Sequence, residues 1–194
     1  MLNEVLKISS PLSEKKFIDC TFGGGGYSKE ILKFSKTNVK AIDRDKKILP
    51  EARALEAKFP ERFKFYPIKF SQLDTISKDY VDIIIFDLGL SSIQLDDFDR
   101  GFSFNSKKGL DMTMGLNEVT AFDAINNLSE IDLKLVIKVL GDEKEASKIA
   151  KNIVKHRNEK KISNTAELVK IIEKSKKKNY SSKINPCTKT FQAI

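Results

Sequence analysis

Four consecutive glycines are the first feature of this sequence that could do chemistry. Residues 23–26 follow a short apolar run at 17–20 and precede a helical pattern at 28–34. Glycine permits a sharp turn, and its backbone N–H groups can approach a ligand closely. The start of the following helix adds a field that favours a carboxylate or a phosphate. The run therefore indicates either a loop that binds a nucleotide-like ligand or a purely structural turn.

Two aspartates follow later apolar runs and could contact the same ligand. Asp43 ends the run at 39–43, 17 residues after Gly26, where nucleotide-binding α/β folds use an acidic residue to accept hydrogen bonds from ribose. Asp87 lies near the end of the run at 81–88, at the edge where open α/β sheets bind ligands. The pattern fits a nicotinamide cofactor and S-adenosylmethionine equally, because both present adenosine to this edge. Asp43 could instead belong to a solvated turn.

Other residues that often do chemistry give weaker signals. Cys20 and Cys187 follow no metal-ligand spacing and indicate reduced thiols in a cytosolic protein. His156, the only histidine, lies among lysines and arginines on a helical pattern and is expected at the surface rather than as a catalytic base. No cluster of metal ligands is visible in the sequence, so no metal is expected.

A group of phenylalanines could stack on an RNA base. Phe98, Phe102 and Phe104 alternate with charged and polar residues. Proteins that act on a base often hold it, once extruded, between aromatic rings. The same three rings could equally anchor a long loop to the core.

The first half of the chain alternates β-like and helical patterns. Apolar β-like runs lie at 17–20, 39–43, 63–68 and 81–88, with helical patterns at 28–34 and 46–59. The run at 81–88 is apolar and β-branched through its middle, as expected for a strand buried on both faces. Strand and helix in alternation predict an α/β fold with a parallel sheet.

The second half changes from a loop-like stretch to helices. Residues 91–115 are rich in Ser, Asp, Gly and Phe and are expected to form a long loop. Two helix starts are marked by capping pairs, Ser129 with Asp132 and Asn164 with Glu167. The basic run at 174–178 is expected to end the last of these helices, and Lys176, Lys177 and Lys178 are candidates for contact with RNA phosphates.

The composition is that of a globular protein with unevenly distributed charge. The 194 residues suffice for one domain with a modest insertion. No apolar stretch approaches the length of a membrane span, and the N-terminal residues lack the pattern of a signal peptide. Residues 1–100 hold 17 Lys and Arg against 16 Asp and Glu, whereas residues 101–194 hold 18 against 11. The second half is therefore the better candidate for binding a polyanion, unless its lysines are simply solvated.

Five segments together give a specific resemblance. They are DCTFGGGGYSKEIL at 19–32, AIDRD at 41–45, FDLGLSSIQLDDFDRGFSF at 86–104, GLDMTM at 109–114 and NPCTKTFQAI at 185–194. In this order they resemble the MraW family of methyltransferases that modify small-subunit ribosomal RNA. The resemblance covers nearly the whole chain, and its third segment is long and unusual.

The resemblance implies a class I S-adenosylmethionine-dependent methyltransferase fold, a Rossmann-like sheet with a helical insertion subdomain. It divides the chain into the N-terminal part of the Rossmann-like domain at 1–105, the insertion at 106–185 and the start of a return at 186–194. It also implies N4-methylation of a cytidine in the decoding region of 16S ribosomal RNA. S-adenosylmethionine is then the cofactor, the small ribosomal subunit the partner and the cytoplasm the location.

Matching the family residue by residue implies a set of cofactor contacts. They are Gly25, Gly26, Tyr27, Asp43, Phe70, Asp87 and Gln94. Phe70 matches a residue beside the adenine, while Asp87 and Gln94 flank the reacting end. A cytosine amine is a poor nucleophile because its lone pair is delocalised, so a carboxylate such as Asp87 is expected to orient it. Asp87 could instead contact only the cofactor.

The resemblance also leads to expectations about completeness. Tyr27 stands where the family usually has His, and Gly115 where an Asp is usual. The family begins before the position of Met1 and continues past residue 194, so the chain is expected to be truncated with an incomplete sheet. In the family's strand order, 3-2-1-4-5-7-6, the run at 81–88 would then form an exposed edge. Three readings stay open: an active N4-cytidine methyltransferase, an inactive remnant that at most binds cofactor or RNA, and a basic RNA-binding remnant.

Overall fold

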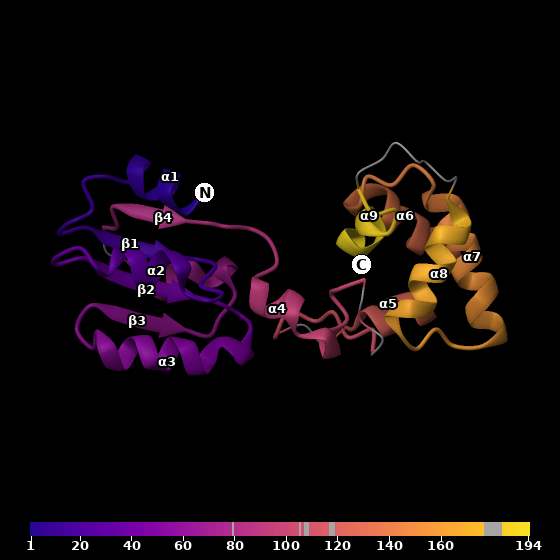
Figure 1. Cartoon of the computed structure of the whole chain (residues 1–194), viewed down its shortest axis with the longest axis horizontal. Helices are drawn as coiled ribbons and strands as arrows, with labels where there is room; N and C mark the ends of the chain where they lie inside the picture. The colour runs from indigo at the N-terminus through magenta and orange to yellow at the C-terminus, as the bar shows by residue number, and fades with distance from the viewer. Residues whose placement is uncertain (79, 105, 107–108, 117–118, 177–183) are drawn as a thin grey trace. The chain divides into compact units, whose positions relative to one another are not determined.

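The computed structural model of the chain describes residues 1–78, 80–104, 106, 109–116, 119–176 and 184–194. They form two compact units (Figure 1). The first, called the sheet unit, comprises Met1–Ile93 and Met114–Leu116, and the second, called the helical unit, comprises Gln94–Thr113 and Asn117–Ile194. No helix in the described ranges is both long and apolar enough to cross a membrane.

A four-stranded parallel sheet organises the sheet unit. Its strands are β1 (Lys16–Asp19), β2 (Asn38–Ile42), β3 (Phe63–Tyr66) and β4 (Ile83–Ile85), in the order β3-β2-β1-β4. The helices of this unit are α1 (Leu2–Ile8), α2 (Gly26–Ile31), η1 (Lys46–Ile48), α3 (Leu49–Lys58) and η2 (Phe70–Thr75). This alternation confirms the predicted α/β class and its Rossmann-like parallel sheet.

An aromatic cluster holds the chain where it leaves β1. The ring of Phe22 lies 5.7 Å from that of Phe63 and 5.4 Å from that of Phe65, measured between ring centroids. All three side chains are buried, and Ile31 of α2 and Leu55 of α3 belong to the same apolar cluster. Close packing of this kind fixes the backbone that follows Phe22 and so fixes the start of the glycine run.

The strand predicted at 81–88 is shorter and less buried than expected. Only Ile83–Ile85 pairs with β1, and β4 is an edge of the described sheet. Ile84, Phe86 and Leu88 are 46%, 49% and 70% exposed, so burial on both faces was a wrong prediction. In the described residues no strand pairs with the outer side of β4, so β4 is the exposed edge that the family's strand order led us to expect.

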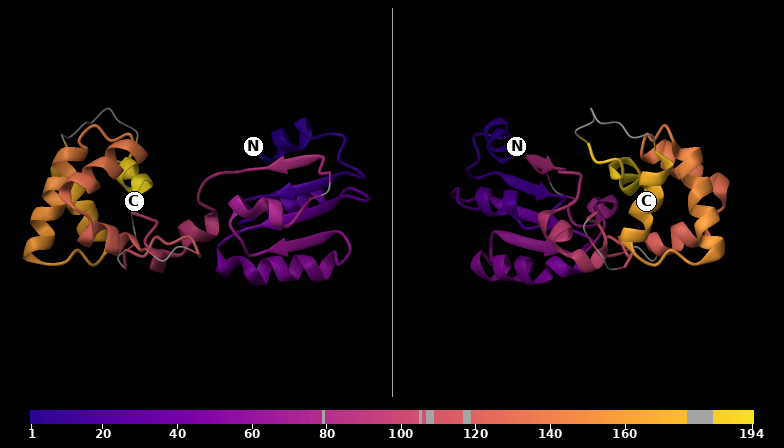
Figure 2. Two further views of the ribbon diagram at one scale, coloured as in Figure 1. Left: turned by 180° about the vertical axis from the view of Figure 1, so that it is seen from behind. Right: turned by 45° about the vertical axis from the view of Figure 1, so that its right-hand side comes forward.

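The helical unit is built from helices that pack on a single apolar core. They are α5 (Ala121–Asn127), α6 (Glu130–Leu140), α7 (Ala146–Glu159), α8 (Thr165–Ser175) and α9 (Thr188–Ala193), with the shorter η3 (Phe98–Arg100) before them. The short helix α4 (Ser92–Asp96) begins in the sheet unit and ends in the helical unit. α7 packs against both α6 and α8 (Figures 1 and 2). The stretch at 91–115 is therefore not all loop, because it contains α4 and η3.

Both predicted capping pairs are confirmed. The Ser129 hydroxyl accepts a hydrogen bond from the Asp132 N–H at 3.1 Å, and the Asn164 side chain accepts one from the Glu167 N–H at 2.9 Å. Each bond satisfies a backbone donor that has no partner within its helix, which is why these helices begin where the sequence indicates.

The phenylalanines of 98–104 lie in two kinds of environment. The Phe104 ring packs edge-on against the Phe191 ring at 4.8 Å, and Phe102 is 8% exposed beneath the Arg100 guanidinium. Phe98 is 52% exposed. Phe102 and Phe104 therefore anchor this segment to the helical unit, and only Phe98 presents a ring to solvent.

The C-terminal segment packs within the helical unit. Cys187 and Phe191 lie in the apolar core that α6, α7 and α8 share. The compact units divide the chain after Ile93, with 114–116 joining the sheet unit, and residues 186–194 belong to the helical unit. The resemblance placed domain boundaries after residues 105 and 185, and these boundaries differ from those of the compact units. They remain a prediction about the domains of the family.

Candidate functional site

The turn between β1 and α2 requires glycine at one position in particular. Gly25 directly precedes α2 with a φ of 76°, in the left-handed region that favours glycine. A Cβ atom added to Gly25 would lie 2.8 Å from the ring of Phe22, whereas one added to Gly26 would meet nothing within 4 Å. The backbone at Gly26 therefore borders open space from which a ligand could approach.

Asp43 fastens this glycine turn to the end of β2. One carboxylate oxygen of Asp43 accepts a hydrogen bond from the Gly23 N–H at 2.8 Å, and the other accepts one from the Asp45 N–H at 2.9 Å. An ionised carboxylate offers about four acceptor positions, so Asp43 keeps capacity for two further donors. The paired hydroxyls of a ribose are donors of the kind that would fill it.

Asp19 is a buried carboxyl at the same edge that the sequence analysis did not select. It ends β1 and is fully buried, and it accepts hydrogen bonds from the Ser28 hydroxyl at 2.7 Å and the Thr21 N–H at 3.2 Å. Burial raises the pKa of Asp19 to about 6, although these hydrogen bonds oppose the rise. The available signal was a charged residue inside the apolar run at 17–20, four positions before the first glycine.

Tyr27 and Asp87 meet across the carboxyl edge of the sheet. The Tyr27 hydroxyl donates a hydrogen bond to an Asp87 carboxylate oxygen at 3.1 Å, and the Asp87 N–H donates one to the Thr21 hydroxyl at 2.8 Å. Burial and then the Asp87 carboxylate raise the pKa of Tyr27, so the phenol stays protonated and remains the donor. The glycine turn, β1 and the end of β4 are thereby joined beside an exposed carboxylate.

Two exposed aromatic rings lie together in the same unit. Phe70 begins η2, and its ring meets the Phe86 ring edge-on with 5.7 Å between centroids. The Phe70 side chain is 45% exposed and the Phe86 side chain 49%. Phenylalanine side chains are more often buried. Such rings offer a face for stacking a flat base. Phe70 was predicted as a site residue, whereas Phe86 was hidden inside an apolar run.

The remaining predicted residues fall outside this group. Gln94 lies on α4 in the helical unit, so its place beside the cofactor stays a prediction. His156 is exposed on α7, where a surface residue was expected. Burial raises the pKa of the Cys20 and Cys187 thiols to about 11 and about 12, which leaves both unreactive. In the described part of the chain, no three acidic, histidine or cysteine side chains gather as metal ligands would.

The segment at 114–116 lies against the loop that follows Asp43. A Cβ atom on Gly115 would come within 2.0 Å of the Arg44 carbonyl oxygen, and Gly115 has a φ of 67°. The Arg44 guanidinium also donates a hydrogen bond to the Met114 sulfur at 2.9 Å. Glycine at 115, which differs from the residue usual in the resembling family, is therefore what allows this close approach.

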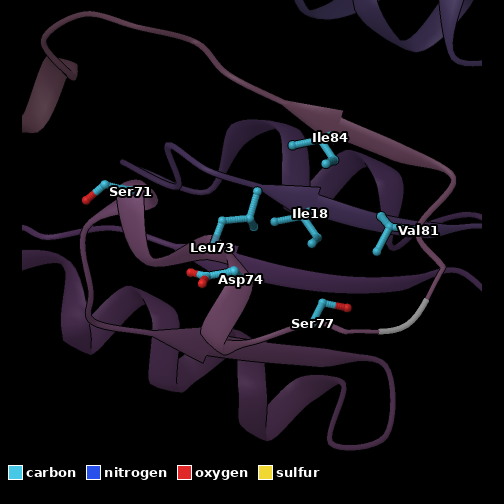
Figure 3. A pocket seen from close by; sticks show the side chains of 7 residues that line it. All are labelled: Ile18, Ser71, Leu73, Asp74, Ser77, Val81 and Ile84. Atoms are coloured by element: carbon cyan, nitrogen blue, oxygen red, sulfur yellow. The ribbon is translucent and has the colours of Figure 1, made fainter.

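A hollow in the sheet unit is separate from these residues. It measures about 510 Å³ and lies between η2 and the β1–β4 side of the sheet (Figure 3). Its lining consists of Ile18, Ser71, Leu73, Asp74, Ser77, Val81 and Ile84. None of the predicted site residues lines it, so the candidate site is the open carboxyl edge and not this hollow.

The buried Asp19 predicts an unusual dependence of stability on pH. Because the pKa of Asp19 rises from 3.8 to about 6 on folding, the folded state binds more protons than the unfolded state between these values, and stability falls as pH rises through them. Asp19→Asn should therefore increase the free energy of unfolding by about 1–3 kcal/mol at pH 7 and have little effect below pH ~4. Urea denaturation of both proteins at several pH values measures this.

Asp74→Asn is the matched control for Asp19→Asn, because Asp74 is exposed beside the hollow. It should change stability by less than about 0.5 kcal/mol. An Asp19→Asn variant that is less stable than the parent at pH 7 would mean that Asp19 is ionised in a favourable environment.

Comparisons with known proteins find relatives along the whole chain. The model of the MraW methylase family matches residues 1–194. A protein named ribosomal RNA small subunit methyltransferase H from Ehrlichia canis (strain Jake) is 41% identical over 100% of this chain and 67% of its own length. Proteins of the same name from Rickettsia africae (strain ESF-5) and Ehrlichia ruminantium (strain Gardel) are 41% and 42% identical, again over 100% of this chain and over 63% and 66% of their lengths. The chain thus spans about two thirds of the relatives it matches.

Proposed function

The chain belongs to the MraW methylase family, and from this membership and the site we propose an S-adenosylmethionine-dependent methyltransferase of small-subunit ribosomal RNA. The observation that carries the proposal is the glycine turn bonded to Asp43, with the exposed Asp87 beside it. The names of the relatives describe small-subunit rRNA methyltransferases. We propose that the methyl transfer takes place in the cytoplasm and uses no metal ion.

The residues at the carboxyl edge fit an adenosyl ligand in three respects. Asp43 retains acceptor capacity for a ribose diol. The exposed rings of Phe70 and Phe86 offer a surface for adenine. The open space beside the backbone at Gly26 leaves room for the amino-acid part of the ligand. S-adenosylmethionine would supply an electrophilic methyl group at this edge.

The nucleophile we propose is the N4 amine of a cytidine in the decoding region. Asp87 would accept hydrogen bonds from the amine and so direct its lone pair, which is otherwise delocalised into the ring. The Tyr27 hydroxyl donates to the same carboxylate, so it orients Asp87 and takes up one of its acceptor positions.

Asp43→Ala should weaken binding of S-adenosylhomocysteine by about 1–3 kcal/mol, because buried ribose hydroxyls would lose a charged acceptor. Isothermal titration calorimetry of the parent and the variant measures the difference. Asp43→Asn leaves a single acceptor oxygen, so it keeps at most one of the bonds from the Gly23 and Asp45 N–H groups. Urea denaturation of both variants therefore accompanies the titration, and a loss of affinity at unchanged stability separates ligand contact from damage to the turn. Asp74→Ala, beside the hollow, should leave affinity unchanged.

Preference for a different adenosine-containing cofactor would refute the proposal. If the parent chain bound NAD more tightly than S-adenosylhomocysteine, the adenosyl site would serve a different chemistry. Methyl transfer is tested by incorporation of tritiated methyl groups into small ribosomal subunits. Binding of the cofactor without incorporation would favour the alternative of a remnant that retains only part of the site.

A further inference from the structure

One helix of the helical unit carries an uncompensated row of lysines. The inward face of α7 is formed by Ala146, Ile149, Ala150 and Ile153, all buried in the apolar core. Lys148, Lys151 and Lys155 lie on the opposite face, and all three are exposed. Spaced at i, i+3 and i+7, they stand on one side of the helix and span about 10 Å along its axis. We call Lys148, Lys151 and Lys155 the α7 lysine row.

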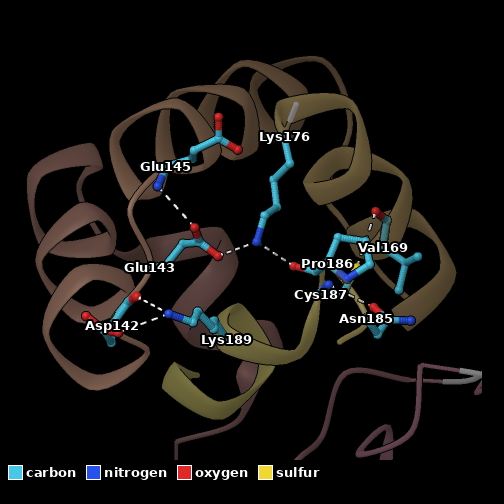
Figure 4. A network of polar contacts seen from close by, with 9 residues as sticks. All are labelled: Asp142, Glu143, Glu145, Val169, Lys176, Asn185, Pro186, Cys187 and Lys189. Carbon is cyan, nitrogen blue, oxygen red and sulfur yellow. Dashed lines mark hydrogen bonds and ion pairs between the residues drawn. The ribbon is translucent and has the colours of Figure 1, made fainter. Parts of the chain in front are cut away.

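Several other lysines of this unit are occupied by acidic partners, as the polar network in Figure 4 illustrates. Lys176 donates to a Glu143 carboxylate oxygen at 2.5 Å and to the Pro186 carbonyl at 2.8 Å. Lys189 pairs with Asp142 at 3.0 Å, and Lys160 lies 3.8 Å from Glu167. The sequence had made Lys176 a candidate for contact with RNA phosphates, but its ammonium group is already paired with Glu143. The other two candidates, Lys177 and Lys178, lie outside the described residues.

The α7 lysine row differs from these lysines in having no acidic partner. None of its three ammonium groups forms an ion pair with a side chain in the described ranges. The acidic residues of the same helical surface, Glu145 and Glu159, flank the row at either end rather than interrupting it. Three flexible ammonium groups in line match an evenly charged polymer better than they match one small anion.

We propose that the α7 lysine row binds the phosphate backbone of the RNA substrate, an inference that rests on the proposed function. Lysines that contact phosphates position a nucleic acid and carry no sequence information. The row therefore holds the RNA, while selection of the cytidine belongs to the carboxyl edge of the sheet unit. Such contacts release counterions, so they make affinity depend steeply on salt.

The test is the salt dependence of RNA binding by the full chain. A stem–loop RNA of decoding-region sequence is titrated by filter binding over a range of KCl concentrations. In the variant Lys148→Gln/Lys151→Gln/Lys155→Gln, the slope of log K against log salt should decrease in magnitude by about 2–3, since each lost phosphate contact contributes about 0.7–0.9. The charge-retaining variant with arginine at the same positions should keep the parent slope.

A matched control removes the same charge elsewhere. Lys7→Gln/Lys58→Gln/Lys64→Gln changes three exposed lysines of the sheet unit and should leave the slope close to that of the parent. An equal change of slope in both triple variants, or no change in the α7 variant, would overturn the proposal and return the row to a solvated surface.

The experiment also separates this inference from the proposed function. Binding of S-adenosylhomocysteine should be the same in the parent and the α7 variant, because the row lies outside the carboxyl edge of the sheet unit. If the parent binds both the cofactor product and RNA, an unchanged slope refutes only the role of the row. If the parent binds neither, the proposed function fails and the inference fails with it.

Discussion

Glu143→Ala is expected to lower the free energy of unfolding of the helical unit by about 3–5 kcal/mol, the usual cost of removing one partner of a buried ion pair. The Glu143 side chain is 4% exposed, and its two oxygens accept from the Lys176 ammonium at 2.5 Å and the Glu145 N–H at 3.0 Å (Figure 4). Without it, Lys176 would stay largely buried, with the Pro186 carbonyl as its remaining acceptor among the described residues. Urea denaturation followed by circular dichroism measures the loss.

Two further variants show whether the buried charge is the cause. Asp142→Ala breaks an ion pair whose carboxylate is 92% exposed, so it should cost less than about 1 kcal/mol. The double variant Glu143→Leu/Lys176→Leu removes both charges and should recover part of the stability lost in Glu143→Ala. A Glu143→Ala variant as stable as Asp142→Ala would mean that water reaches Lys176 freely.

The same pair predicts a dependence on acid. Burial by itself raises the pKa of Glu143, but the Lys176 ammonium and the Glu145 N–H together hold it below its ordinary value. A carboxyl with a lowered pKa contributes stability above its unfolded value of 4.5 and loses it as pH falls through the folded pKa. The difference between parent and Glu143→Ala should therefore shrink below pH ~4.

Gly25→Ala should destabilise the sheet unit by about 2–4 kcal/mol, since it combines left-handed backbone strain with overpacking of the core. The added Cβ would lie 2.8 Å from the ring of Phe22, which is itself enclosed by Phe63 and Phe65. A thermal or urea melt of the variant gives the value. Binding of S-adenosylhomocysteine should be lost together with the turn.

Gly26→Ala is the matched control, and it separates stability from ligand contact. Its Cβ would meet nothing within 4 Å, and Gly26 is the first residue of α2. Stability should therefore be unchanged or slightly higher, because alanine favours helix more than glycine does. Affinity for S-adenosylhomocysteine should nevertheless fall, because the methyl group enters the space proposed for the ligand. Normal affinity in Gly26→Ala would exclude Gly26 from the site.

Features that depend on neighbours in the sequence were predicted well. The order of strands and helices follows from apolar runs and helical spacing, which reflect burial of one face of each element. Ser129 and Asn164 cap the predicted helices because a cap forms between residues three apart.

Features that depend on what lies opposite in space were not predictable. The apolar residues of 81–88 look the same in a central strand and in an edge strand, so the edge position of β4 was expected from the strand order of the resembling family and not from this segment itself. Lys176 belongs to a basic run, yet it is held by Glu143, 33 residues earlier in the chain. Neither propensity nor periodicity contains information about such a partner, because burial and charge pairing arise only when distant segments pack together.

The sequence by itself determined the α/β class, the family and the residue types available at the carboxyl edge of the sheet. Only the tertiary structure decided which of them interact: Tyr27 with Asp87, Asp43 with the glycine turn, and Ser28 with Asp19, whose pKa burial raises to about 6. The physical reason is that hydrogen bonds act over about 3 Å and the electrostatic effect of burial depends on the whole surrounding volume. Both are properties of the folded chain and not of any segment within it.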